Sequence, residues 1–282
     1  PSATEICDDG IDNDCDGGRG SCGLSGDLAV GAAASTVSAA STNARYGQSL
    51  TTAADFDGDG HVDLLVGAEE HEIHGVSDAG GAFVVFGPLS GAESAGDGAR
   101  FDGPDADGLV GQAVAAAGDI NGDGHADFAV SGDETTDSDN GAGVVYVAFG
   151  PITAGQVRTL GTDLRWRGVD TSDYAGDSLA GMIDIDNDGN DDLLVGAYGG
   201  GASIEGAVYL LNGPLTTSGD LDSADHIWSG PAGLTSFGTS VAVVGDTDGD
   251  GLDDFAVGAD REGTAGVEAG AAYVFHGPLS AA

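Results

Sequence analysis

The sequence predicts an all-β protein built from repeated four-stranded units, and three observations support this fold class. An Asp-rich phrase occurs four times at a nearly constant interval, at 55–63, 119–127, 184–192 and 246–254. A Gly-Pro pair recurs at almost the same interval, with its prolines at Pro88, Pro151, Pro214 and Pro278. The chain also contains 52 glycines among 282 residues, which suits many tight turns between short strands. Such a fixed period indicates a repeat architecture.

Each repeat is predicted to contain four strands in a fixed order. The first strand follows an apolar residue and a glycine, at Tyr46-Gly47, Val110-Gly111, Ala175-Gly176 and Phe237-Gly238. The second is an apolar run typical of a strand buried on both faces, at 64–68, 128–130, 193–197 and 255–259. The third ends at Gly-Pro, because proline cannot continue the ladder, at 82–86, 144–149, 207–212 and 271–276. A weaker fourth strand includes 101–103, 166–168 and 228–230.

Antiparallel units of about 60 residues that cannot bury both faces alone are typical of β-propeller blades. We therefore predict a propeller over 25–282, with repeats at about 46–109, 110–174, 175–236 and 237–282. The last repeat lacks a fourth strand, and residues 35–39 have the matching pattern at the matching distance ahead of Gly47. These residues are predicted to complete the last blade and close the ring. Residues 27–32 look like a second strand without its loop, so the blade number is four or five.

The Asp-rich phrases are predicted to be calcium loops. Each places oxygen side chains at loop positions 1, 3, 5 and 9 and a backbone carbonyl at position 7, which is the ligand set of a hard cation. The expected side-chain ligands are Asp55, Asp57, Asp59, Asp63, Asp119, Asn121, Asp123, Asp127, Asp184, Asp186, Asp188, Asp192, Asp246, Asp248, Asp250 and Asp254. The expected carbonyl ligands are His61, His125, Asn190 and Leu252. The sequence therefore predicts about four Ca²⁺ ions, with the weakest site at Asn121, where one charge is missing.

Composition excludes several partner classes. The formal net charge of −41 disfavours nucleic acid and anionic membrane surfaces. No apolar run reaches about 18 residues, so no membrane-inserted helix is expected. Calcium loops of this kind fill at the millimolar Ca²⁺ outside cells, which favours a secreted or cell-surface location. The first residue is proline, which suggests a processed or excised form.

A catalytic role is not expected. The chain has no G-x-S-x-G elbow, and its three cysteines, Cys7, Cys15 and Cys22, all lie near its start. His71 and His74 could seat a transition metal, but they lack an evident third ligand. Calcium saturated by loop oxygens is expected to be structural, because it leaves no organised open coordination position.

The repeat resembles the FG-GAP repeat of integrin α-subunit propellers and of bacterial integrin-like proteins. The resemblance covers roughly residues 46–282 and is carried by Phe237-Gly238, the loop at 246–254, AVGA at 256–259 and GAAYVF at 270–275. It implies an adhesion module that binds a protein or glycan on a cell surface or matrix. Two alternatives stay open: a building block that forms dimers or fibres by strand exchange, and a lectin-like propeller.

Residues 1–24 form a separate predicted segment. Residues 5–17, EICDDGIDNDCDG, resemble a short cysteine-bracketed metal-binding motif of secreted bacterial surface proteins. The resemblance implies a bacterial origin, a pairing of Cys7 with Cys15, and a fifth ion held by Asp12, Asp14 and Asp16. Cys22 is a competing partner for that disulfide.

Overall fold

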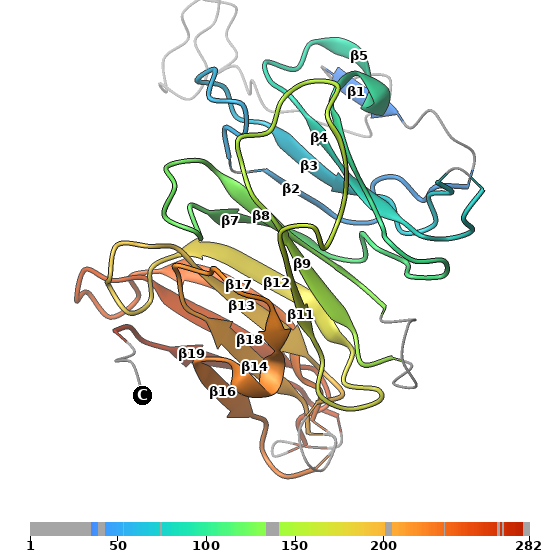
Figure 1. The fold of residues 1–282 in the computed structure, drawn as a ribbon. Helices are drawn as coiled ribbons and strands as arrows, with labels where there is room; N and C mark the ends of the chain where they lie inside the picture. Colours follow the sequence, from blue (N-terminus) through green and yellow to red (C-terminus); the bar gives the residue numbers. More distant parts are fainter. Residues whose placement is uncertain are drawn as a thin grey trace, which may run out of the picture.

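The four repeats fold into four antiparallel sheets arranged one after another along the chain (Figure 1). The computed structural model describes residues 35–38, 43–133, 141–200, 205–263 and 266–278, apart from Ala53, His74, Leu234 and Val267. The predictions for residues 1–34, including the cysteine-bracketed motif and the phrase at 27–32, therefore lie outside the described residues. Besides strands, the described residues form two short 3₁₀ turns, η2 (Ala95–Asp97) and η3 (Leu221–Ser223).

Each sheet is a ladder of strands in chain order, as predicted. The first sheet contains β2 (Leu50–Thr52), β3 (Leu64–Gly67), β4 (Gly81–Val85) and β6 (Ala99–Asp102). The second contains β7 (Val114–Gly118), β8 (Asp127–Gly132), β9 (Val144–Ala148) and β11 (Leu164–Arg167). The third contains β12 (Ala175–Ile183), β13 (Asp192–Ala197), β14 (Ala207–Leu211) and β16 (His226–Ser229). The fourth contains β17 (Phe237–Gly245), β18 (Asp254–Ala259) and β19 (Ala271–Phe275).

Short parallel strands link consecutive repeats, a feature that the sequence did not indicate. After its Gly-Pro pair, the second repeat sends β10 (Val157–Thr159) back to β6 of the first sheet. The third repeat likewise sends β15 (Gly219–Asp220) back to β11 of the second sheet. Each link extends the preceding sheet by one strand and ties neighbouring blades together.

The strand predicted to close the ring is paired on one edge, with a link strand of the first repeat. β1 (Ser35–Ser38) pairs in parallel with β5 (Gly91–Ser94), which follows the Gly-Pro pair of the first repeat. This pairing is equivalent to β6 with β10 and β11 with β15, so β1 takes the place of a fourth strand ahead of the first sheet. Among the described residues, nothing pairs with the outer edge of β19, and closure of the ring is not seen.

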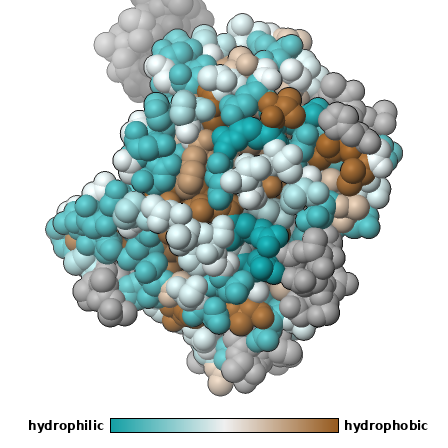
Figure 2. Space-filling model, viewed as in Figure 1, coloured by the Kyte–Doolittle hydropathy of each residue, from teal (hydrophilic) through white to brown (hydrophobic). Residues whose placement is uncertain are grey.

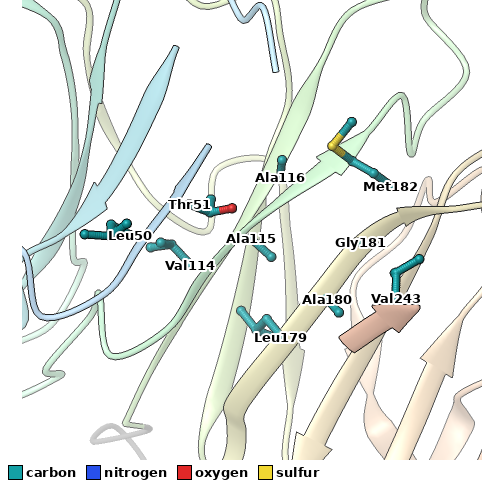
Figure 3. Close-up of a pocket in the computed structure, with 10 residues that line it drawn as sticks. All are labelled: Leu50, Thr51, Val114, Ala115, Ala116, Leu179, Ala180, Gly181, Met182 and Val243. Carbon is teal, nitrogen blue, oxygen red and sulfur yellow. The ribbon is translucent and has the colours of Figure 1, made fainter. Parts of the chain in front are cut away.

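The first strands of the four sheets face a common groove. β2, β7, β12 and β17 are neighbours in that order. Side chains from all four line a groove of about 500 Å³, among them Leu50, Val114, Leu179 and Val243 (Figure 3). Sheets whose first strands surround one axis are blades of a propeller, which confirms the predicted fold class.

Apolar cores fill the spaces between adjacent blades. Phe101 of the first blade meets Phe128 of the second edge to face, with ring centroids 4.7 Å apart. Trp166 lies in the core between the second and third blades, and Trp228 packs on Phe255 of the fourth at 5.2 Å. The large aromatic residues of the fourth strands therefore stabilise contacts between blades. Burying a side chain of this size contributes about 1.5–3 kcal/mol.

The fourth blade differs from the second and third in how its strands are buried. β8 and β13 are buried along their whole length, whereas exposed and half-buried positions alternate in β19. Val274 and Val244 are exposed on this blade, at 51% and 41%. In the view of Figure 2, hydrophilic residues are widespread and separate hydrophobic patches lie among them. Within the described part of the chain, no helix is long and apolar enough to cross a bilayer.

Candidate metal centres

The four Asp-rich phrases connect the first strand of each blade to its second. We number them loop 1 to loop 4, at 55–63, 119–127, 184–192 and 246–254. All four are therefore at the same end of their blades, and each is held by two strands of a rigid sheet.

The backbone of each loop wraps around its first carboxylate. In loop 1, Asp55 accepts N–H groups from Gly58, Asp59 and Gly60 at 2.7–3.0 Å. The bonds from positions 5 and 6 recur in the other loops, where Asp119, Asp184 and Asp246 are the acceptors. The N–H groups lower the pKa of Asp55, chiefly that of Gly60, which keeps this carboxylate charged.

Glycine is required at position 6 because the chain turns there with a positive φ. The φ angles are 90°, 86°, 94° and 92° at Gly60, Gly124, Gly189 and Gly251. A residue with a Cβ is strained in this region. The turn brings the later ligand positions back toward the first carboxylate.

The aspartate at position 9 is buried and joins three parts of its blade. Each of these four side chains is at most 1% exposed: Asp63, Asp127, Asp192 and Asp254. One oxygen accepts the N–H of loop position 2, as Asp192 does from Ile185 at 2.8 Å. The other accepts the N–H of the glycine before proline, as Asp192 does from Gly213 at 2.9 Å. Equivalent bonds occur in the other three loops. The recurring Gly-Pro pair thus belongs to the architecture of the loop, a role the sequence pattern did not reveal.

The structure brings several of the predicted ligands together. Carboxylate oxygens of Asp55, Asp57 and Asp63 lie within 4.8 Å of one another, as do those of Asp184, Asp186 and Asp192. In loop 4 the grouped residues are Asp246, Asp248 and Asp250. In loop 2, Asn121 supplies an amide oxygen that accepts the N–H of Asp123 at 2.8 Å. Asp59 and Asp188 lie outside the three-residue groups and instead accept the N–H of position 7 at 2.8 Å, from His61 and Asn190.

Burial raises the pKa of the position 9 aspartates in the first three loops. The pKa rises to about 7 for Asp127 and for Asp192, and also rises for Asp63, because each carboxylate is removed from water and faces other loop carboxylates. A bound cation would relieve this cost by neutralising the cluster. The pKa of Asp254 is instead lowered, first by the hydrogen bond from the Thr247 hydroxyl, so loop 4 has a different electrostatic environment.

The donor set of loops 1 to 3 fits Ca²⁺. It consists of oxygen atoms alone, from carboxylates or an amide, and Ca²⁺ takes six to eight oxygen ligands. The outer ligands are exposed or half-buried while position 9 is buried, so an ion could enter from solvent. Bound there, Ca²⁺ would supply the positive charge that the converging carboxylates lack.

The residue before each Gly-Pro pair lies beside the loop, and it varies between blades. It is Phe86, Phe149, Asn212 or His276. Asn212 donates from Nδ2 to Asp186 at 2.9 Å. His276 Nδ1 is 3.1 Å from Asp254 and 3.6 Å from Asp248. Sequence reasoning missed these two residues because they lie outside the Asp-rich phrase, although their fixed place before Gly-Pro was a usable signal.

Of the two histidines that the sequence singled out as potential metal ligands, only His71 belongs to the described residues. His71 is 7% exposed and packs edge to face on Phe83, with centroids 5.2 Å apart. Burial lowers its pKa. His74 lies outside the described residues.

A pair of tyrosines is found at the end of the third blade opposite loop 3. Tyr174 immediately precedes β12, and Tyr198 immediately follows β13. Their rings are stacked, with centroids 4.9 Å apart and planes at 4°. Tyr174 is 40% exposed, so the pair presents aromatic surface to solvent.

Blades with an Asp-rich, hydrogen-bonded loop in the first hairpin define a class of β-propellers. The chain belongs to the FG-GAP repeat family: its family model matches residues 46–85, 110–147, 175–211 and 237–275. These matches begin near the first strand of each blade and end in the third, so they contain every loop.

Comparison with individual proteins indicates integrin α subunits. The chain is 34% identical over 163 residues to integrin alpha-PS2 of Drosophila melanogaster, covering 54% of this chain and 11% of that protein. It is 38% identical over 148 residues to integrin alpha-5 of Xenopus laevis, covering 48% of this chain and 13% of that protein. It is 32% identical over 158 residues to human integrin alpha-IIb, covering 55% and 15%. The matched region is thus a small part of each relative.

Proposed function

We propose that this chain is a secreted or cell-surface adhesion module whose blades are stabilised by Ca²⁺, and that it has no catalytic role. The observation that carries the proposal is the recurrence of one hydrogen-bonded loop geometry at four equivalent places in an FG-GAP propeller. The integrin α relatives support protein binding in general terms. A bacterial source, suggested by the N-terminal motif, belongs to the same proposal.

Calcium would act by holding together the end of the first strand and the start of the second, which the loop connects. Position 9 begins the second strand and also accepts the N–H of the glycine at the end of the third, so an ion at the loop connects three strands. A ligand bound only to the native state adds about 2.7 kcal/mol per site at a hundredfold excess over Kd.

Calcium binding can be tested by titration calorimetry on the chelator-treated protein. The proposal predicts saturable Ca²⁺ binding at loops 1 to 3 at least, together with weaker binding when Asp57, Asp119 or Asp184 is replaced by Ala. Replacement of Asp222, an exposed aspartate outside the loops, should leave the titration unchanged. Absence of measurable binding at millimolar Ca²⁺ would overturn the proposal.

The blade ends opposite the loops are the proposed ligand-contacting surface. The stacked pair of Tyr174 and Tyr198 gives this end a rigid aromatic contact, and tyrosine is enriched among residues that dominate binding energy. The same pair could stack on a sugar ring, which is the specific reason to keep a lectin-like propeller as an alternative.

A panel of immobilised matrix glycoproteins and a glycan array separate these two functions. Binding to a glycoprotein that survives enzymatic deglycosylation and is weakened at least tenfold in Tyr198→Ala supports protein adhesion. Selective binding on the glycan array, lost in the same variant, supports the lectin. Val62→Ala, at the loop end of the first blade, is the control that should bind like the original protein.

Self-association is a second candidate function, favoured by two strand edges that have no partner in the described part of the chain. β4, β9 and β14 each have neighbours on both sides, whereas β19 pairs only with β18 among the described strands. Among the described residues β1 pairs only with β5, whereas its counterparts β6 and β11 each pair with a link strand and also with the third strand of their own blade, β4 or β9. Transferring the register of β14 and β16 to the last blade places Ser38 opposite Ala271 and Val37 opposite Ala272.

Cross-linking distinguishes closure within one chain from exchange between two copies. The Cα atoms of directly opposed residues in an antiparallel pair are about 4.5–5.5 Å apart, a distance that a disulfide can bridge. A Ser38→Cys, Ala271→Cys variant lacking the three native cysteines should form a disulfide on oxidation. A cross-linked monomer would show a closed ring, and a cross-linked dimer would show strand exchange. If no disulfide forms while Ser38→Cys, Ser94→Cys does cross-link, both pairings are excluded.

A further inference from the structure

Loop 4 is chemically unlike the other three loops. The residue before Gly-Pro is phenylalanine in the first two repeats and asparagine in the third, but it is His276 in the fourth. His276 immediately follows the third strand, β19, and the next N–H, from Gly277, donates to Asp254 at 3.1 Å. The fold therefore brings an imidazole to the edge of a carboxylate cluster.

The distances around His276 are those of ligands that share one ion. Its Nδ1 is 3.1 Å from Oδ2 of Asp254 and 3.6 Å from Oδ2 of Asp248, and one ligand atom from each of the three residues lies within 4.8 Å of the other two. With bonds of about 2.0–2.2 Å, neighbouring ligands of a transition metal are about 3.0–3.5 Å apart for octahedral to tetrahedral geometry. Small side-chain adjustments would thus place one ion between the nitrogen and both oxygens.

The place occupied by His276 is set by the repeat and is open to solvent. In the third blade, Asn212 occupies the same place and also reaches a loop aspartate, Asp186, at 2.9 Å. The His276 side chain is 48% exposed and that of Asp248 is 40% exposed, so an ion could reach them. Asp254 lies beneath them with a fully buried side chain.

We propose that loop 4 is a mixed nitrogen and oxygen site that prefers a borderline transition-metal ion such as Zn²⁺ over Ca²⁺, with His276 as the selecting ligand. The proposal rests on the proposed cation binding of the loops. Imidazole suits Zn²⁺ and its first-row neighbours, whereas Ca²⁺ takes oxygen ligands. The residue before Gly-Pro is a phenylalanine beside loops 1 and 2 and an asparagine beside loop 3. Neither residue offers the imidazole nitrogen that favours a transition-metal ion.

A competing role for His276 is that of an ion-pair partner for Asp254 without a metal. The two roles differ in what a metal probe reports. As a ligand, the imidazole nitrogen would be bonded to the ion and magnetically coupled to it. As an ion-pair partner, it would be displaced by the ion or would exclude it.

The test compares the original His276 with His276→Asn and His276→Phe, which reproduce the third and the first two blades. All three proteins carry serine at the native cysteines, because thiolates also bind Zn²⁺. Zn²⁺ affinity is measured by calorimetry in excess Ca²⁺, and Mn²⁺-loaded protein is examined by pulsed electron paramagnetic resonance for nitrogen coupling. His226→Asn, outside the loops, is the control.

The proposal predicts one Zn²⁺ per chain that survives excess Ca²⁺, at least tenfold weaker binding in both His276 variants, and nitrogen coupling that they lose. Ca²⁺ binding at loops 1 to 3 should be the same in all proteins. Equal Zn²⁺ affinity in the variants, or no nitrogen coupling in the original protein, would overturn the inference while leaving the calcium proposal intact. Failure of every loop to bind Ca²⁺ would instead overturn the calcium proposal. Asn is compatible with this fold at the equivalent place, so His276→Asn keeps the test valid if His276→Phe misfolds.

Discussion

Loops 3 and 4 share their hydrogen-bond pattern but not their surroundings. Loop 3 belongs to a blade that is covered on both faces, and the pKa of its buried Asp192 rises to about 7. Loop 4 belongs to the end blade, where the Thr247 hydroxyl and His276 hydrogen-bond to Asp254 and lower its pKa. The Asp-rich phrase thus sets the shape of a loop, while neighbouring blades and the residue before Gly-Pro set its electrostatics.

The largest expected effect is the loss of stability when the position 9 aspartate is replaced, and this loss should differ between loops 3 and 4. Asp192→Ala should lower the free energy of unfolding by about 3–5 kcal/mol in the absence of metal, because it strands the N–H groups of Ile185 and Gly213 inside the protein. Asp254→Ala should cost less, since the N–H groups that it strands lie in the less covered end blade. Urea denaturation of both variants gives the two values. A larger loss for Asp254→Ala would reverse the comparison.

A more modest, calcium-dependent loss is expected at loop 3. Asp188→Ala should remove an oxygen near the ion and reduce the stabilisation by Ca²⁺, by up to about 2.7 kcal/mol at a hundredfold excess over Kd. Without Ca²⁺ the loss should be well below that figure. Asp222→Ala is the matched control and should change stability by less than about 0.5 kcal/mol in either condition. Thermal melting with and without Ca²⁺ measures both, and equal losses in the two conditions would argue against a metal at loop 3.

The smallest expected effect is a dependence of stability and of apparent Ca²⁺ affinity on pH at loops 2 and 3. The pKa of Asp127 and of Asp192 lies near 7 in the folded protein, above the ordinary value of 3.8, so the folded state binds these protons more tightly than the unfolded state does. The metal-free fold is therefore most stable when both carboxyls are protonated, and it loses stability as the pH rises toward and through 7. Calcium needs the carboxylates ionised, so apparent affinity at loops 2 and 3 should be about tenfold weaker at pH 6 than at pH 8. Calorimetry at the two pH values tests this. Affinity that is independent of pH would show that protons do not compete with the ion.

Much of the fold followed from local patterns. The strand positions were predictable because Asp-rich loops and Gly-Pro pairs mark the ends of apolar runs at one period. The pairing of β1 with β5 was not predictable from the sequence. Both strands, STVS and GAES, are short and have only a weak alternation of apolar and polar residues. Ring closure concerns two distant chain ends, about which the local sequence says little.

For the candidate metal centres, the loop residues could be predicted from the sequence, but their contacts with the third strand could not. Spacing predicted a carboxylate cluster in each loop, and the structure brings together positions 1, 3 and 9 in loops 1 and 3 and positions 1, 3 and 5 in loop 4. The burial of position 9 and the role of the glycine before proline depend on the third strand, which is distant from the loop in sequence. His276 was missed for the same reason, since its distance from Asp254 is a property of the folded sheet.

Calorimetric melting in excess Ca²⁺ and in excess chelator is the decisive experiment for the role of the loops. If the loops hold Ca²⁺ and thereby stabilise the blades, the melting temperature must rise with Ca²⁺ concentration, and the rise must shrink when a loop aspartate such as Asp188 is removed. Identical melting curves in Ca²⁺ and in chelator would show that the blades do not depend on the ion.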